Sequence, residues 1–390
     1  MSVLESKFRA AQDEIRNFMK CYPDFVIKSR VAALKGEIPV FAFHSIDPVV
    51  FQKQLDYLEE NGYRTLSIEE YLLGLGGEKR SSSESVLLTI DDGRQSVWKH
   101  AFPLLKKYGM KAVVFVLPGH TKAENSPTHF EAQCSAVQKR DEQEPLLSWE
   151  QLRTMHSSGL VDIQSHTLYH HLIYVSPKIT GVYVSSTRGP FYTLPVPKEF
   201  EGSIDLDTWD MLWGMPIYEF RPLMTGQPRY LDDPSCRKAC RSHYEEYLQG
   251  KKGAVVKKDM AAFLRKYVSK YGIGGRVTTL QEVRSEMTES LSRSRELIEE
   301  HLPGHRVMAV CWPHGAFCDQ AIDFAKEAGY QACLCGTLPG RKSNRVGDNP
   351  FLTVRLKNDY IFRLPGEGRR SLGSIMAKKM GRRLRGETGY

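Results

Sequence analysis

Several features that assign a chain to a common class of protein are missing from this sequence. Its 390 residues contain no run of ~18 or more uninterrupted apolar residues, which a membrane-spanning helix requires. The first stretch, Met1 to Lys28, mixes charged and apolar side chains, so it lacks the apolar core of a secretory signal and predicts an amphipathic helix. We therefore expect a cytoplasmic protein, or one held peripherally at the inner face of a membrane.

Cysteine motifs are also absent. The eight cysteines are scattered and form no small-domain disulfide framework, which favours free thiols in a reducing compartment. Cys236 and Cys240 have the spacing of two helical metal ligands, but no second pair follows at the spacing of a zinc finger. We expect no structural zinc there.

The usual nucleophile and phosphate motifs are missing as well. Ser45, Ser96 and Ser165 lack the G-x-S-x-G context of a nucleophile elbow. No cysteine lies in a recognisable activating motif, and Gly272 to Gly275 matches neither phosphate-binding glycine fingerprint. Serine and cysteine hydrolases and P-loop enzymes are disfavoured.

Charge is unevenly distributed. The net charge is +8, and residues 361–390 hold eight arginines and lysines against two glutamates, so most of the excess lies in this basic segment. It has few aromatic residues and no nucleic-acid-binding module, so we expect no nucleic acid partner. Apolar residues such as Leu372, Ile375 and Met376 alternate with the cations, which suits contact with an anionic membrane. A solvated tail is the alternative.

Strand and helix signals alternate along most of the chain. Capping boxes at Ser67 to Glu70 and at Ser148 to Gln151 predict two helix starts. Such a βαβα order favours parallel strands wrapped by helices, in a barrel or a doubly wound sheet, with chemistry at the carboxyl ends of the strands. The predicted strands are Ile38–Phe43, Val86–Ile90, Ala112–Leu117, Leu160–Gln164, Val307–Cys311 and Gln331–Cys335.

The predicted domains are an N-terminal helix and linker at 1–37, a barrel at 38–360 and the basic segment at 361–390. A stretch rich in proline and aromatic residues interrupts the alternation of strand and helix signals. The sequence after it becomes helical and charged. We interpret it as an insertion, at about 172–300, that shapes or covers the site. The alternative is a separate packing subdomain.

Two clusters of polar residues follow predicted strands. Asp91 and Asp92 precede Gly93, a pattern that alone predicts a turn, but adjacent acids repel and usually need a cation or a division of roles. Downstream, His166 and His170 are spaced to meet one ion, although a hydrogen-bonded histidine pair is the alternative. Two imidazoles and Asp92 would form an open site for Zn²⁺ or a similar divalent metal, leaving Asp91 to act as the base.

These motifs resemble the polysaccharide deacetylase family (NodB type, carbohydrate esterase family 4). Thr89 to Gly93 resembles its first motif, His166 to His170 its second, and Trp312-Pro313-His314-Gly315 its third. The resemblance implies a distorted (β/α) barrel, here with a long, partly helical insertion. It also implies a hydrolase of linear amide C–N bonds that removes N-acyl groups, usually acetyl, from amino sugars. The implied metal is Zn²⁺, with Co²⁺, Ni²⁺ or Mn²⁺ as alternatives.

The resemblance also carries residue roles. It makes Asp91 the base, Asp92, His166 and His170 the metal ligands, and Arg355 the group that orients Asp91, although a surface strand arginine is the alternative. The backbone N–H at His314, where the family usually has tyrosine, would bind the oxyanion. Phe43-His44 resembles a Tyr-His pair of several relatives. We expect the substrate-binding residues to be His44, Trp312, Pro313 and Gly315.

One family feature is missing. No histidine follows His314, whereas the family often supplies a late histidine that protonates the leaving amine. His314 is our first candidate for this acid. His44, a water molecule or a residue of the insertion are alternatives, and the ring of His314 need not matter if only its backbone N–H acts.

The expected substrate is an acylated amino sugar carried on a lipid or a nucleotide during assembly of a surface polysaccharide or glycolipid. The basic segment and the missing signal peptide motivate this expectation. The alternatives are hydrolysis of a non-sugar C–N amide bond on the same barrel, or a non-catalytic sugar-binding protein.

Overall fold

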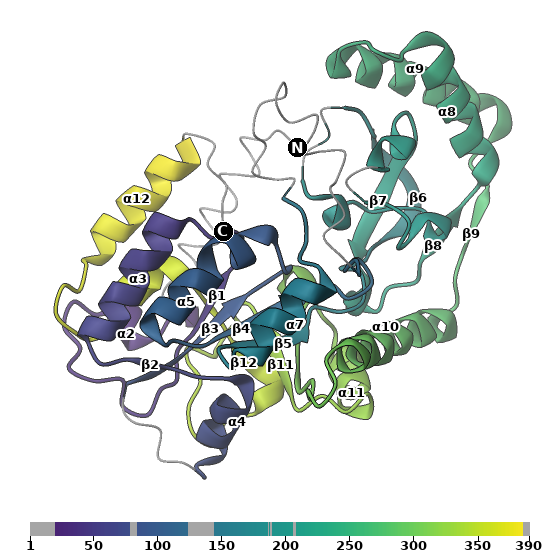
Figure 1. Cartoon of the computed structure of the whole chain (residues 1–390). Coiled ribbons are helices and arrows are strands. Elements are labelled where there is room, and N and C mark those ends of the chain that lie inside the picture. The colour runs from purple at the N-terminus through teal and green to yellow at the C-terminus, as the bar shows by residue number, and fades with distance from the viewer. Residues whose placement is uncertain are drawn as a thin grey trace.

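Parallel strands wrapped by helices form the body of the protein, and an insertion extends to one side of it (Figure 1). The computed structural model describes residues 20–78, 84–123, 144–185, 187, 189–205 and 208–384. The strands of the main sheet are β1 (Val40–Phe43), β2 (Arg64–Thr65), β3 (Ser85–Ile90), β4 (Ala112–Val116), β5 (Val161–Ser165), β10 (Ala309–Cys311), β11 (Ala332–Cys335), β12 (Thr353–Val354) and β13 (Leu356–Lys357). All their pairings are parallel.

The sheet curls into a nearly closed barrel, which confirms the predicted α/β fold and selects the barrel over the doubly wound sheet. The strand order is β12-β11-β10-β5-β4-β3-β1-β13, and β2 pairs with the beginning of β3. The two end strands are separated in sequence only by Arg355. The chain therefore closes the ring by pairing with β11 before Arg355 and with β1 after it.

Burial explains the strand sequences. All six residues of β3 and all five of β4 are buried, because the barrel interior covers one face and helices cover the other. Both predicted capping boxes are confirmed, at Ser67 with Glu70 and at Ser148 with Gln151. The surrounding helices are α3 (Pro48–Glu60), α4 (Ile68–Gly76), α5 (Phe102–Tyr108), α7 (Trp149–Ser157), α10 (Leu280–His301) and α11 (Asp319–Glu327).

The insertion has its own layers. A long antiparallel ribbon of β6 (Leu172–Val182) and β7 (Pro216–Pro222) leads to a short pair, β8 (Tyr230–Asp232) and β9 (Gly275–Val277). Two helices, α8 (Pro234–Tyr247) and α9 (Gly253–Tyr271), form the outer end of the insertion, at the upper right of Figure 1.

The predicted end of the insertion, at about residue 300, needs correction. Helix α10 falls inside the predicted range, but its buried residues Val283, Met287 and Leu291 belong to the main core of the barrel. Helix α10 also packs against α11 and β5. Its exposed face is rich in charge, so composition alone did not separate it from the insertion.

Both ends of the described chain pack on the barrel. The amphipathic helix expected at the N-terminus lies, up to residue 19, outside the described residues. Helix α2 (Asp24–Ile27) buries Phe25 and Val26 and contacts η9 (Asn358–Arg363). Helix α12 (Leu372–Leu384) buries Ile375 and lies beside α3 (Figure 1). The described part of the basic segment is therefore folded onto the barrel.

No helix in the described ranges combines the length and the apolar character needed to cross a bilayer. Every cysteine within the same ranges is a free thiol, as predicted.

Candidate active site

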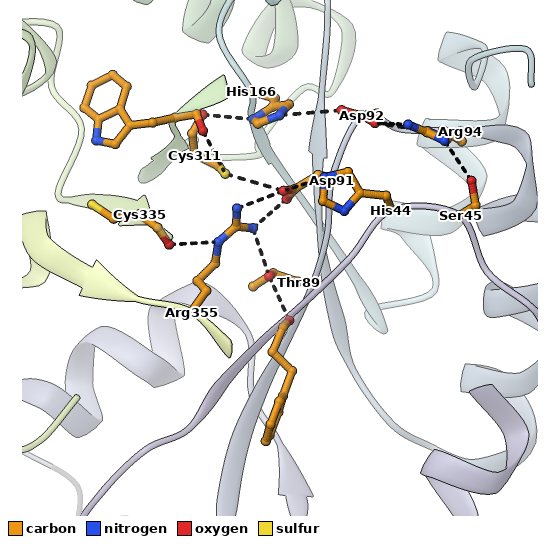
Figure 2. Close-up of polar contacts among 12 residues, drawn as sticks. His44, Ser45, Thr89, Asp91, Asp92, Arg94, His166, Cys311, Cys335 and Arg355 are labelled. Carbon is orange, nitrogen blue, oxygen red and sulfur yellow. Dashed lines mark hydrogen bonds and ion pairs between the residues drawn. The ribbon is translucent and has the colours of Figure 1, made fainter. Parts of the chain in front are cut away.

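The barrel brings the predicted site residues together at the carboxyl ends of its strands. Asp91 and Asp92 follow β3, His44 follows β1, and His166 follows β5. Figure 2 shows these side chains converging with Arg355, which lies between β12 and β13. Residues far apart in sequence meet here because parallel strands direct their carboxyl ends to one rim of a barrel.

Asp92, His166 and His170 form a compact and buried group. Their ligand atoms all lie within 4.8 Å of one another. His166 Nδ1 lies 2.9 Å from the carbonyl oxygen of Cys311, which only accepts, so Nδ1 donates and Nε2 is left with its lone pair. His166 Nε2 faces Asp92 Oδ1 at 3.6 Å.

A divalent metal fits this group. Buried His170 Nδ1 has no hydrogen-bond partner among the described residues, which is costly unless something else satisfies it. Two imidazoles and a carboxylate are also the donor set of open zinc sites, and a backbone carbonyl behind one imidazole is a usual outer partner.

Backbone strain is concentrated around this group. Asp92, Thr167, His170 and His314 adopt positive φ angles of 71°, 65°, 60° and 56° without being glycines. Each such residue costs roughly 1–3 kcal/mol and persists only where its surroundings enforce it. The surrounding fold therefore holds these imidazole and carboxylate groups in fixed positions at the expense of backbone strain.

Two residues that the sequence did not indicate hold Asp92. Arg94 approaches Asp92 Oδ2 with Nη2 at 2.7 Å and Nε at 3.0 Å, and the Tyr192 hydroxyl donates to the same oxygen at 3.0 Å. Although burial opposes it, the charges of His44 and Arg94 hold the pKa of Asp92 well below its ordinary value. With Oδ2 occupied, Asp92 Oδ1 is the oxygen available beside His166.

Tyr192 shows that the insertion takes part in the site. It lies in the 3₁₀ turn Phe191–Thr193 of the insertion, a hundred residues from Asp92. This contact favours the interpretation that the insertion shapes the site over a separate packing subdomain. Arg94 could have been noticed as a cation directly after the Asp-Asp-Gly motif, whereas no sequence signal marks Tyr192.

Asp91 is held by a different partner. Arg355 Nη1 and Nη2 lie 2.6 and 2.8 Å from Asp91 Oδ1 and Oδ2, a bidentate pair. Arg355 is itself fixed by the carbonyl of Cys335 and the hydroxyl of Thr89, each at 3.2 Å (Figure 2). Burial raises the pKa of Asp91, but the Arg355 guanidinium outweighs it and lowers that pKa to about 2. Arg355 is thus buried on Asp91, which excludes the surface-arginine alternative.

Two further groups contact Asp91. His44 Nε2 lies 3.7 Å from Asp91 Oδ2, and the His44 side chain is 30% exposed. The Cys311 thiol lies 3.8 Å from the same oxygen and is fully buried. His44 therefore connects Asp91 to the accessible side of the site, and Cys311 lies on the barrel side. The role of Cys311 was not indicated by the sequence.

The third motif is divided between the site and the core. The His314 ring meets the His170 ring edge-on, with centroids 4.5 Å apart, and His314 is exposed at the rim. Pro313 is buried, and Gly315, at φ 63°, lies against the backbone of Gly336.

Trp312 does not lie where we expected it. Its side chain is fully buried and stacks on Phe317 in the barrel core, so the structure makes it a packing residue instead of a substrate contact. Its place in a motif next to His314 did not reveal that strand alternation turns it to the opposite face from Cys311, into the core between the strands and the helices.

Comparisons with known proteins agree with this geometry. Residues 78–185 match the family model described as polysaccharide deacetylase, a range that includes Asp91, Asp92, His166 and His170. The chain is 32% identical over 143 residues to YxkH of Bacillus subtilis (strain 168), named as a polysaccharide deacetylase-like protein, a match that covers 35% of this chain. It is 30% identical over 129 residues, 33% of this chain, to poly-beta-1,6-N-acetyl-D-glucosamine N-deacetylase of Escherichia coli (strain K12).

These sequence matches cover 44% and 18% of the relatives' own lengths, less than half of each. Among solved structures, the deacetylase domain of BpsB from Bordetella bronchiseptica aligns over 84% of this chain and 97% of that chain, at 18% identity and a TM-score of 0.50. This likeness shows the fold. Residues 78–185, which carry the first two motifs, are therefore similar to the polysaccharide deacetylase family, and the barrel has the fold of a solved deacetylase domain.

Proposed function

We propose that this chain is a metal-dependent hydrolase that removes acetyl groups from N-acetylated amino sugars. The observation that carries the proposal is the division between two adjacent acids. Asp92 lies with two imidazoles in a buried donor set, whereas Asp91 is turned to Arg355 and stays outside that set. A sugar-binding protein without activity would not need a charged, oriented acid beside a metal site.

The residues present fit the roles of an amide hydrolase. Asp92, His166 and His170 would hold the metal, preferably Zn²⁺, with Co²⁺, Ni²⁺ or Mn²⁺ as alternatives. Such an ion polarises an acyl oxygen and lowers the pKa of water toward neutrality. Asp91 takes the proton of the attacking water at its carboxylate, which Arg355 keeps in place. The backbone N–H of His314 would stabilise the developing oxyanion.

For the substrate, the relatives named above support a polymer of N-acetylated hexosamine, and the sequence suggested a lipid-linked or nucleotide-linked sugar. The test is an acetate-release assay with the metal-loaded protein on three substrates: β-1,6-linked N-acetylglucosamine oligomers, UDP-N-acetylglucosamine and a lipid-linked N-acetylglucosamine. We expect release from at least one of these substrates, loss of release with a chelator, and recovery with Zn²⁺. Release that is insensitive to a chelator, or that occurs only from a non-sugar amide, would refute the proposal.

His44 is the residue that we now prefer as the acid for the leaving amine. It lies 3.7 Å from Asp91 and so sits beside the proposed base, whereas His314, the more exposed of the two, contacts the ring of His170. His44→Ala should lower acetate release from an N-acetyl sugar by ~10²–10⁴-fold. It should spare hydrolysis of an aryl acetate, because an aryl oxide leaves without a proton. His314→Ala is the matched comparison, and an amide-selective loss there instead would move the role to His314.

Tyr192→Phe should weaken metal binding, because the variant loses one of the groups that orient Asp92. Outer partners of metal ligands are typically worth ~10–100-fold in affinity. The measurement is competition for Zn²⁺ against a chromophoric chelator. Tyr183→Phe is the control, since Tyr183 lies in the same insertion cluster and its hydroxyl bonds the carbonyl of Pro195 instead of Asp92. Equal affinities for wild type and Tyr192→Phe would contradict this role.

We further propose that the protein works in the cytoplasm and that its basic segment contacts an anionic membrane at the inner face. On α12, the cation Lys378 and the apolar Met380 are exposed, whereas Ile375 is buried against the barrel. The exposed part of α12 therefore supplies both a charge and an apolar side chain to a membrane surface.

A further inference from the structure

A second candidate binding site lies away from the barrel rim. A cavity of about 770 Å³ separates the chain just after α2 from the loop that leads into α12. Figure 1 shows α2 and α12 on the side of the molecule remote from α8 and α9. Four arginines line this cavity, and the apolar side chains of Ile27, Val31 and Leu372 line it as well. The arginines are Arg30, Arg363, Arg369 and Arg370.

Two of these arginines are fixed, and their charges are not neutralised. Arg363 is 2% exposed and donates to the carbonyls of Val26, Lys28 and Arg370. Arg369 likewise donates only to carbonyls, including that of Phe25. Among the described residues, neither guanidinium forms an ion pair with a carboxylate. Burial lowers the pKa of both guanidinium groups, and repulsion from Arg369 lowers that of Arg363 further.

The other two arginines have free donors. The guanidinium of Arg370 lies 3.5 Å from the centre of the Phe362 ring, which holds it in place without using its N–H groups. Within the described chain, neither Arg370 nor exposed Arg30 donates a side-chain hydrogen bond or forms an ion pair. The fork of N–H groups on a guanidinium matches the oxygens of a phosphate.

The N-terminus of helix α12 adds to the positive electrostatic potential of the cavity. Helix α12 has 13 residues and begins at Leu372, at the edge of the cavity. Ser371 accepts from the N–H of Ser374 and so caps this end. The remaining first N–H groups of a helix have no intrahelical acceptor and favour an anion. Fixed arginine charges, free guanidinium donors and a helix start therefore converge on one cavity.

We propose that this cavity binds the phosphate group of an anionic lipid headgroup. A phosphate would supply the counter-charge that Arg363 and Arg369 do not receive from any carboxylate among the described residues. The apolar contribution of Ile27, Val31 and Leu372 suits the lipid part of an amphiphile better than it suits a fully hydrated inorganic anion. The inference gives the proposed membrane contact a defined site, and it is independent of the chemistry proposed for the barrel.

The test is binding of the full-length protein to phosphatidylcholine vesicles with and without phosphatidic acid. We expect binding only with phosphatidic acid. Arg370→Ala and Arg30→Ala should each weaken it ~10-fold or more, because each removes charged hydrogen bonds to phosphate. Lys378→Ala is the matched control on the exposed face of α12. It should cost about 5-fold, the effect of one surface charge near an anionic membrane.

A soluble short-chain phosphatidic acid distinguishes the sources of phosphate. It should raise the melting temperature of wild type and leave the melting temperature of Arg30→Ala unchanged. Inorganic phosphate should raise the melting temperature of wild type much less. Equal losses of vesicle binding in Arg370→Ala, Arg30→Ala and Lys378→Ala would refute the cavity as the binding site and would leave only a general membrane contact. Inorganic phosphate as effective as the lipid would overturn the lipid assignment. Acetate release from a soluble sugar should be the same in all variants, so failure of this site and failure of the proposed hydrolase are separate results.

Discussion

Replacing Asp91 with asparagine is expected to lower the rate of acetate release by ~10²–10⁴-fold, the usual contribution of a general base. Asparagine keeps the shape of the side chain and one acceptor for Arg355 but cannot take a proton from water. Metal binding should persist, because Asp91 is outside the donor set of Asp92, His166 and His170. The paired measurement is metal content by elemental analysis and acetate release under saturating substrate.

Asp92→Asn is the matched control for this experiment, since it makes the same chemical change one residue away. It should lose metal affinity along with activity, because Asp92 supplies a charged ligand. Two adjacent acids would then give two distinct phenotypes. Undiminished acetate release by Asp91→Asn, or loss of its metal, would refute the division of roles on which the proposed function depends.

Arg355→Met is expected to destabilise the protein by ~3–5 kcal/mol, the usual cost of removing one partner of a buried ion pair. Asp91 would remain buried without the charge that keeps it ionised. Methionine fills much of the vacated volume, so the effect should come mainly from charge. The measurement is the free energy of unfolding from urea denaturation, followed by two optical probes to test for a single transition.

A double-mutant cycle separates charge from packing. Adding Asp91→Asn to Arg355→Met removes the stranded carboxylate, so the double variant should be more stable than the sum of the two single losses predicts. Arg355→Lys should be intermediate, because an ammonium keeps the charge but not the bidentate fork. Strictly additive losses would mean that Arg355 stabilises the barrel through packing alone.

The alternation of apolar strands and capped helices was enough to predict parallel strands wrapped by helices, because both patterns are local. The choice of a barrel over a doubly wound sheet came from the resemblance to the deacetylase family. The grouping of Asp92 with His166 and His170 was predictable for a related reason, since strand ends of a parallel barrel meet at one rim. Tyr192 could not be predicted, because its approach to Asp92 depends on how the insertion folds back.

Local pattern also misled in two places. Trp312 follows a buried strand and precedes a site residue, and only the packed core shows which way its ring turns. Helix α10 carries so many charges on its outer face that the buried apolar residues on its inner face do not stand out in the sequence. In both cases the deciding quantity was the orientation of a side chain relative to the barrel, which composition does not contain.

Arg355 lies where the barrel closes, and this position affects the order in which the active site is assembled during folding. The segment of β12, Arg355 and β13 is the last of the sheet to leave the ribosome, long after Asp91 has been made. Until that segment docks between β11 and β1, Asp91 lacks the bidentate guanidinium of Arg355. A docking error of one residue would turn the guanidinium away from the interior. Closure of the barrel and pairing of Asp91 with Arg355 are thus a single folding event. A chain that ends before Arg355 is expected to be inactive.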